Sequence, residues 1–250
     1  MLFLITAALV VSRIGAVIMI MPVFNTLGVP KLYRLAIALC LSVIVTPVVP
    51  QAHLSTLSEL LLAMVGEVIV GVVMGGTVAI LFGAITMASE FMGMQIGLRI
   101  AAVFDPLSVS QTGLLSSMSR WLATLVFLGA NLHLWVINAV GDSFLLVPPG
   151  AASDPLAAGA LWVPTLNHAI TCGVRLAGPV MVLVFLVQAF LGIMVRLAPN
   201  MNVFFAVGLI INVGVGMGLY HEALPTLLME HLAIVQESLS IIGRVAELVR

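Results

Sequence analysis

Long apolar stretches separated by short polar connections make up most of the chain. A helix of about 20 apolar residues crosses the hydrocarbon core of a bilayer, so these stretches predict membrane-spanning helices. The expected spans are residues 2–22, 35–49, 57–98, 121–140, 169–195 and 203–220, with a further helix from residue 222 onward. Lys31 and Arg34 are expected to form a small basic loop between the first two spans. The pattern therefore predicts an all-α integral membrane protein of about six to seven long helices.

Composition points to the same class. Hydrophobic residues make up 62% of the chain and charged residues only 8%, with a mean hydropathy of +1.26, whereas soluble domains carry about 25% charged residues. The net charge of -1 and the lack of a basic run argue against nucleic acid as a partner. The first residues show no positively charged region and no cleavage site before Arg13, so we expect a first span there and not a removable signal peptide.

Residues 89–120 form the most polar connection, and they carry Glu90, Arg99, Asp105 and Arg120. Proline disfavours the helical conformation in the residue before it, so Asp105-Pro106 predicts a helix break. A short segment rich in serine and threonine follows. Such a segment is either a re-entrant element enclosed by protein or, more commonly for this composition, an ordinary exposed loop.

Small residues recur every four positions along the third expected helix. Glycines at this spacing leave a bare helix face that another helix backbone can approach closely. We expect close helix packing at Gly71, Gly75, Gly93 and Gly97.

Three charges, Arg13, Glu67 and Arg175, fall within expected spans. A charge at the centre of a membrane helix costs about 2.5 to 3.5 kcal/mol on insertion scales, so such groups face a partner or a polar path. We favour the interpretation that these charges pair with one another or with other subunits. The alternative is that they form a path for ions or protons.

Catalytic and metal-binding signatures are not evident. His221-Glu222 begins like a zinc-binding HExxH motif, but position 225 is a proline. Cys40 and Cys172 form no Cys-x-x-Cys motif, and no G-x-S-x-G elbow occurs. We expect no enzyme activity, no metal and no cofactor.

Several motifs, taken in order, resemble one known family. They are SRIGAVIMIMPVF, VPKLYRLAIAL, GEVIVG, SEFMGMQIGLRIAAVFDP, NLHLWVINAVGDSF with VPPG, and RLAPNMNVFFAVG. Together they resemble the FliR family, the subunit of the flagellar type III protein-export gate that is related to SctT of injectisomes. Two positions depart from the family pattern: Leu132 stands where glycine is frequent, and Ile210 where proline is common.

The resemblance implies a single domain over 1–250, with FliP-like helices in 1–165 and a FliQ-like helical hairpin in 166–250 that turns at Arg196 and Pro199. It implies a plug loop over 104–118 that closes an export pore, with gating residues Phe104, Asp105, Pro106, Leu107, Ser108, Val109, Ser110, Gln111, Thr112 and Gly113. Arg13, Glu67 and Arg175 would then serve helix and subunit packing.

The implied partners are FliP and FliQ, then FlhB and FlhA, with unfolded export substrates passing through the assembly. The implied location is the bacterial inner membrane at the flagellar basal body, with several passes through the bilayer. The alternatives are a polytopic secondary transporter or channel for a small solute, which usually has internal repeats and a midplane site, and an intramembrane enzyme.

Overall fold

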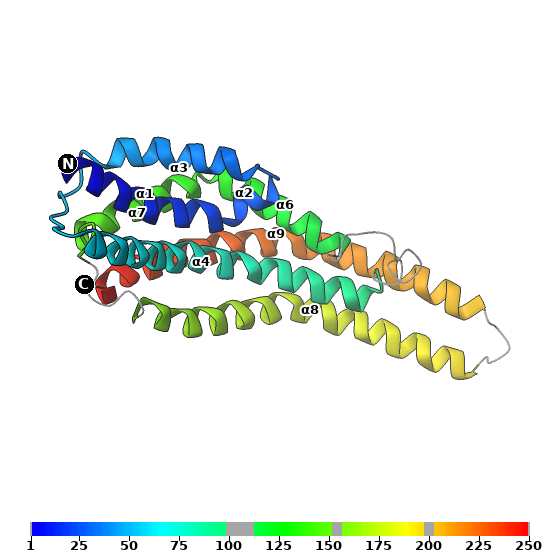
Figure 1. Ribbon diagram of the computed structural model, residues 1–250. Helices are drawn as coiled ribbons and strands as arrows, with labels where there is room; N and C mark the ends of the chain where they lie inside the picture. The colour runs from blue at the N-terminus through cyan, green and yellow to red at the C-terminus, as the bar shows by residue number, and fades with distance from the viewer. Residues whose placement is uncertain (1, 99–112, 152–156, 198–202, 250) are drawn as a thin grey trace. The chain divides into compact units, whose positions relative to one another are not determined.

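The structure, a computed structural model, describes residues 2–98, 113–151, 157–197 and 203–249. Over these ranges the chain is α-helical, with one short 3-10 helix and no strand (Figure 1). The helices form two compact units. The first comprises Met1–Phe82, Thr124–His168 and Leu232–Arg250, and the second comprises Gly83–Ala123 and Ala169–His231. The predicted all-α membrane protein is confirmed.

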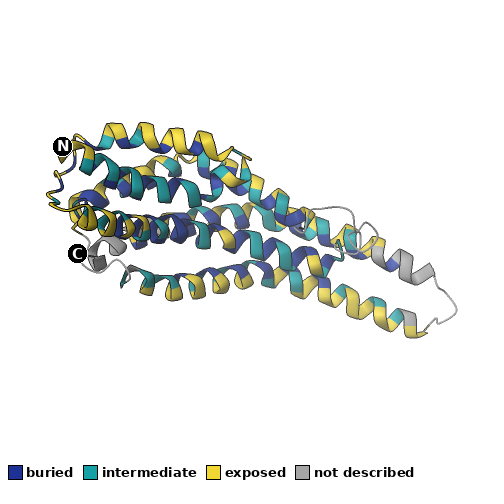
Figure 2. Cartoon of the chain, in the orientation of Figure 1, coloured by how far each residue is buried: buried dark blue, intermediate teal, exposed yellow. Residues whose placement is uncertain are grey.

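The first unit contains α1 (Leu2–Ile20), α2 (Pro22–Thr26), α3 (Lys31–Val45), the first part of α4 (Leu57–Ile96), the end of α6 (Leu114–Gly129), α7 (Leu132–Leu146) and η1 (Ala157–Leu161). Helices α1 and α3 pack against each other. The opposite face of α3 is exposed (Figure 2) and apolar, with Leu32 75%, Val43 72% and Ile44 66% exposed. An exposed face of this composition suits lipid or another protein better than water.

The expected basic loop at residues 31–34 is wrong, because these residues form the first turn of α3. Arg34 is only 8% exposed. Its guanidinium donates from Nε to the Val29 carbonyl oxygen at 2.9 Å and from Nη1 to Asn25 Oδ1 at 2.6 Å. The cation therefore satisfies the polar groups of the turn that precedes its own helix, and most of its surface is buried.

The expected span over 121–140 is also wrong as one continuous helix. It is divided between α6 and α7, whose axes are bent by 67°. Asn131 at the junction has a φ of 56°, a left-handed conformation that cannot continue a right-handed helix.

Helix α3 has 15 residues, or about 22 Å of helix, which is shorter than the hydrocarbon core.

Three helices are long and apolar enough to cross a membrane within the described ranges, in Leu2–Ile20, Leu57–Ile96 and Gly159–Met194, and the bent pair α6 and α7 makes a fourth if it counts as one span. Among the other described helices, α3 is too short to cross the hydrocarbon core as a straight helix. The described part of the chain is thus polytopic.

The second unit contains the end of α4, the start of α6, and most of α8 (Trp162–Leu197) and α9 (Val203–Val249). Here α8 and α9 run antiparallel to each other (Figure 1). Helix α9 passes through Pro225 without a break, so the sixth expected span and the helix expected after residue 222 are one element. Packing is close, since a Cβ atom on Gly216 would lie 2.5 Å from Ile96 Cγ1.

Helix α4 ends at Ile96, well before Asp105-Pro106. Gly97 has a φ of 90°. The Gly97 N–H donates to the Met94 carbonyl oxygen at 3.1 Å, and the Leu98 N–H donates to the Gly93 carbonyl oxygen at 3.2 Å. This pair of bonds is the Schellman arrangement, in which a left-handed glycine ends the helix. Gly97 therefore ends α4, and the interhelical contact expected at this glycine stays a prediction.

Candidate functional site

A fully buried ion pair joins α1 to α4 in the first unit. Arg13 Nε lies 2.5 Å from Glu67 Oε2, and both side chains are 0% exposed. Burial of either charge alone would be very costly, whereas a close pair with its remaining polar atoms satisfied is tolerated. Two of the three charges expected within spans therefore lie together.

The remaining polar atoms of the pair have partners on α7 and on the turn that follows it. Arg13 Nη1 donates to Ser143 Oγ at 3.1 Å, and Nη2 donates to the Val147 carbonyl oxygen at 3.2 Å. Glu67 Oε1 accepts from the Gly150 N–H at 2.8 Å. The guanidinium carbon also lies 4.2 Å from the centre of the Phe144 ring, within cation–π range.

This cluster fixes α1, α4, α7 and the turn at 147–150 in one arrangement. Among the described residues it presents no open polar path, because the donors and acceptors of the pair are directed at each other, at the Ser143 hydroxyl and at backbone groups. The geometry fits a rigid structural joint better than a route for ions or protons.

Two glycines of α4 bring α1 within reach of this pair. A Cβ atom on Gly71 would lie 2.4 Å from the Arg13 carbonyl oxygen, and one on Gly75 would lie 3.0 Å from the Val17 carbonyl oxygen. A neighbouring glycine, Gly76, makes room for Trp162, whose indole N–H donates to the Val73 carbonyl oxygen at 3.2 Å.

Arg175 does not join the buried pair. It is exposed on α8 in the second unit, where it lines a cleft together with Glu230 of α9. The third intramembrane charge is therefore placed at a surface.

In the second unit, hydroxyl groups and one carboxylate connect the start of α6 to α4. Glu90 accepts hydrogen bonds from the Gly113 N–H, at 3.3 Å, and from Ser116 Oγ. Ser89 Oγ donates to Ser119 Oγ at 2.5 Å, and Ser119 shares a further hydrogen bond with the Tyr220 hydroxyl of α9. Ser89 and Ser119 are fully buried, so this chain of hydroxyls ties three helices together.

The expected gating residues from Phe104 to Thr112 lie outside the described residues, and so does Pro199 of the expected hairpin turn. Gly113 is the first described residue after the gap. Gly93 lies against Leu115, with 3.7 Å between the Leu115 Cβ and a Cβ built on the glycine. Arg196 lies in the last turn of α8.

The sequence alone did not predict this chain of hydroxyl groups. Ser116 and Ser119 are three residues apart and so share one face of α6, but nothing in the neighbouring sequence indicates that they pair with Ser89 or Tyr220.

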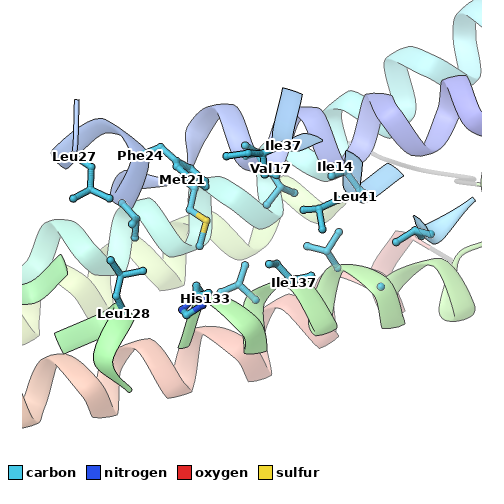
Figure 3. Close-up of a pocket in the computed structure, with 16 residues that line it drawn as sticks. Ile14, Val17, Met21, Phe24, Leu27, Ile37, Leu41, Leu128, His133 and Ile137 are labelled. Atoms are coloured by element: carbon cyan, nitrogen blue, oxygen red, sulfur yellow. The ribbon is translucent and has the colours of Figure 1, made fainter. Parts of the chain in front are cut away.

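An apolar cavity of about 160 Å³ lies between α1, α3 and α7 in the first unit (Figure 3). Its lining includes Val17, Met21 and Ile137, and its one polar side chain is His133. His133 Nδ1 is buried and has no hydrogen-bond partner among the described residues. Apart from this imidazole the pocket is lined by hydrocarbon, and it is partly open to the surface of the first unit.

These elements define an all-α integral membrane protein held together by a buried ion pair. Its sequence matches the family model described as bacterial export proteins, family 1, over residues 4–238. Similar proteins include the flagellar biosynthetic protein FliR of Escherichia coli (strain K12), 30% identical over 225 residues that cover 88% of this chain and 85% of the relative. The FliR of Caulobacter vibrioides is 32% identical over 203 residues, 80% of each chain, and that of Bacillus subtilis is 28% identical over 214 residues, 83% of this chain and 81% of the relative.

The chain belongs to the FliR family of bacterial export proteins. Membership of this family makes it a component of flagellar protein export.

Proposed function

We propose that the chain is a gate subunit of the flagellar type III export apparatus. It assembles with FliP and FliQ in the bacterial inner membrane at the basal body, and FlhB and FlhA join this core. The assembly conducts unfolded flagellar proteins, and the chain itself catalyses no reaction. Membership of the FliR family and the polytopic helical fold support this role.

The gating element is the segment 104–118. The observation that carries this proposal is the way the described residues on its two sides are held. On one side, Gly97 ends α4 with a left-handed turn. On the other, Gly113 and Ser116 are bonded to Glu90, which lies less than two turns before the end of the same helix. The chain therefore leaves α4 and returns to it at the same end, as a loop that plugs a pore from one side requires.

The proposed mechanism is passive. The loop occupies the lumen while no substrate is present, an arriving unfolded chain displaces it, and the anchor at Glu90 returns it afterwards. The buried pair of Arg13 and Glu67 takes no part in conduction and holds the scaffold rigid. Energy for export comes from other parts of the apparatus.

A deletion tests the plug. Removal of Val109–Thr112 leaves the Gly113 anchor in place but shortens the loop. We expect the complex with FliP and FliQ to assemble and to conduct small ions in a planar bilayer when no substrate is present. Removal of Ser153–Leu156, an equal deletion in the other long connection, is the control and should leave the resting conductance low. An unchanged resting conductance in the first variant contradicts the plug.

Co-purification separates this role from that of a secondary transporter. A gate subunit requires FliP and FliQ to be extracted in one homogeneous particle. A transporter is homogeneous when expressed alone and binds a small solute. Failure of FliP and FliQ to co-purify with the full chain removes the gate proposal.

A further inference from the structure

A cleft of about 340 Å³ between α8 and α9 in the second unit has both apolar walls and charged groups. Arg175 of α8 and Glu230 of α9 line it, together with Thr226. Both charged residues are exposed, and neither has a hydrogen-bond or ion-pair partner in the described part of the chain. The cleft thus holds one cation and one anion that do not neutralise each other directly.

Pro179 adds an acceptor at the same place. A proline has no N–H, so the carbonyl oxygen four residues earlier loses its helical donor. Pro179 lies inside α8, and four residues earlier is Arg175 itself. The cleft therefore offers the Arg175 guanidinium as donor, with the carboxylate of Glu230 and the Arg175 carbonyl oxygen as acceptors.

The position of Arg175 along α8 corresponds to the edge of the hydrocarbon core. Arg175 and Arg196 are 21 positions apart in one helix, or about 31 Å, close to the thickness of about 30 Å of a bilayer core. Gln188 is the one hydrogen-bonding side chain between them, whereas the turns before Arg175 carry Thr165, Asn167, His168 and Thr171. When Arg196 lies at one membrane–water interface, Arg175 lies at the level of the lipid headgroups at the opposite interface.

The surface between the two arginines suits acyl chains. Val182 (59%), Phe185 (60%) and Leu186 (57%) are exposed on α8, and Figure 2 shows exposed positions along this part of the helix. A molecule with its polar end in the cleft has apolar surface to lie on toward the bilayer centre.

We infer that the cleft between α8 and α9 binds the headgroup of phosphatidylethanolamine. The phosphate of this lipid accepts from the Arg175 guanidinium, and its ammonium group donates to Glu230 and to the free carbonyl oxygen of Arg175. Charge-assisted bonds of this kind are the strong ones. A trimethylated choline headgroup has no N–H to donate, and a glycerol headgroup has no cation, so the site discriminates against both.

The inference does not depend on the proposed gating. The test uses the full chain in nanodiscs with equal amounts of phosphatidylethanolamine, phosphatidylcholine and phosphatidylglycerol, followed by mild extraction and native mass spectrometry of the lipids retained. We expect phosphatidylethanolamine to be retained about fivefold over each of the other two, the ratio that about 1 kcal/mol for an exposed charged contact gives.

Variants identify the two halves of the site. Arg175→Gln should lose most lipid retention, whereas its control on the same helix, Arg196→Gln, should retain the preference. Glu230→Gln should reduce the ethanolamine-to-choline ratio to about one while phospholipid is still retained, and the exposed control Glu222→Gln should behave as the unmodified chain does. Neither Arg175 nor Glu230 has an internal partner to lose, so we expect both variants to fold.

Three results would overturn the inference. Equal retention of the three lipids by the unmodified chain, a measurement that needs no variant, removes the headgroup specificity. An equal loss in Arg175→Gln and Arg196→Gln removes the cleft as the site. Release of FliP or FliQ from the Arg175→Gln complex, with lipid retention unchanged, shows that the cleft is a protein interface instead.

Discussion

The carbonyl oxygen of Arg13 lies 2.4 Å from the position that a Cβ atom on Gly71 would occupy. Real side chains do not come this close to a backbone oxygen, so α1 and α4 contact each other at a distance that only glycine permits. The same residue of α1 supplies the guanidinium that pairs with Glu67. The backbone contact and the ion pair therefore hold the same two helices together. A change that moves α1 away from α4 weakens both.

Substitution of Gly71 by alanine should destabilise the protein. Neither the Arg13 carbonyl nor the Ala16 Cβ, 2.8 Å away, can move without a shift of α1, and overpacking of this kind costs about 1 to 3 kcal/mol. We expect a lower thermal midpoint of the purified complex. Gly83→Ala is the matched control on the same helix, because nothing lies within 4 Å of its Cβ position. There alanine should be neutral or stabilising through its helix propensity. Equal effects at the two positions would contradict the close contact.

The buried ion pair should behave non-additively. Arg13→Leu or Glu67→Leu alone leaves an unpaired buried charge, which costs about 3 to 5 kcal/mol. The double variant has no unpaired charge and should lose much less stability than the sum of the two single variants, although the Gly150 N–H and the Val147 carbonyl then lack a partner. A double-mutant cycle of thermal unfolding measures this coupling. Additive losses would show that the two charges do not depend on each other.

The cavity between α1, α3 and α7 should accept one more methyl group. Val140 lines it and is 5% exposed, so Val140→Ile buries additional hydrocarbon worth about 0.8 kcal/mol per methylene. The thermal midpoint should rise. Val10→Ile is the matched control, since Val10 is 0% exposed and does not line the cavity. That change should overpack the core and lower the midpoint. A lower midpoint for Val140→Ile would mean that the cavity is closed in solution.

Cysteines at positions 89 and 119 should form a disulfide. The two hydroxyl oxygens are 2.5 Å apart, so the side chains point at each other at a separation compatible with disulfide geometry. In a background without Cys40 and Cys172, mild oxidation of Ser89→Cys with Ser119→Cys should abolish labelling by maleimide after the protein is denatured, since both positions are buried in the folded state. Ser89→Cys with Ser117→Cys places the second thiol on another face of α6, and labelling should persist. Cross-linking in both pairs would mean that α6 turns freely against α4.

The cross-linked protein then reports on gating. The bond joins α4 to α6 beside the anchor of the proposed plug but leaves the loop unrestrained. Export that continues in the oxidised state shows that the loop moves without its supporting helices. Export that stops only under oxidation, and resumes on reduction, shows that opening requires α4 and α6 to separate.

Hydropathy was sufficient for most of the helices and for the class of protein. Sequence patterns did not predict the roles of several individual residues, because those roles depend on contacts and on backbone conformation. Arg34 was expected in a basic loop because it is charged, yet its guanidinium is enclosed by the carbonyl groups of the preceding turn. Leu132 follows Asn131, whose positive φ divides an otherwise apolar stretch into two helices. Gly97 fitted a packing stripe by spacing, but its role in ending α4 was not predicted, since spacing does not distinguish a bare helix face from a left-handed turn.

Composition, local periodicity and the order of the motifs were enough to predict the membrane class, the approximate positions of most helices and the family. The packing of the helices brings Arg13 to Glu67 across 54 positions and leaves Arg175 at a surface, and no local pattern predicts either outcome. In the same way, a Cβ atom on Gly71 would meet the backbone of α1, whereas one on Gly83, on the same stripe, would meet no atom of the described residues within 4 Å. A pattern of residues specifies which face of a helix is small or charged. Which helix lies against that face depends on the packing of all the helices together.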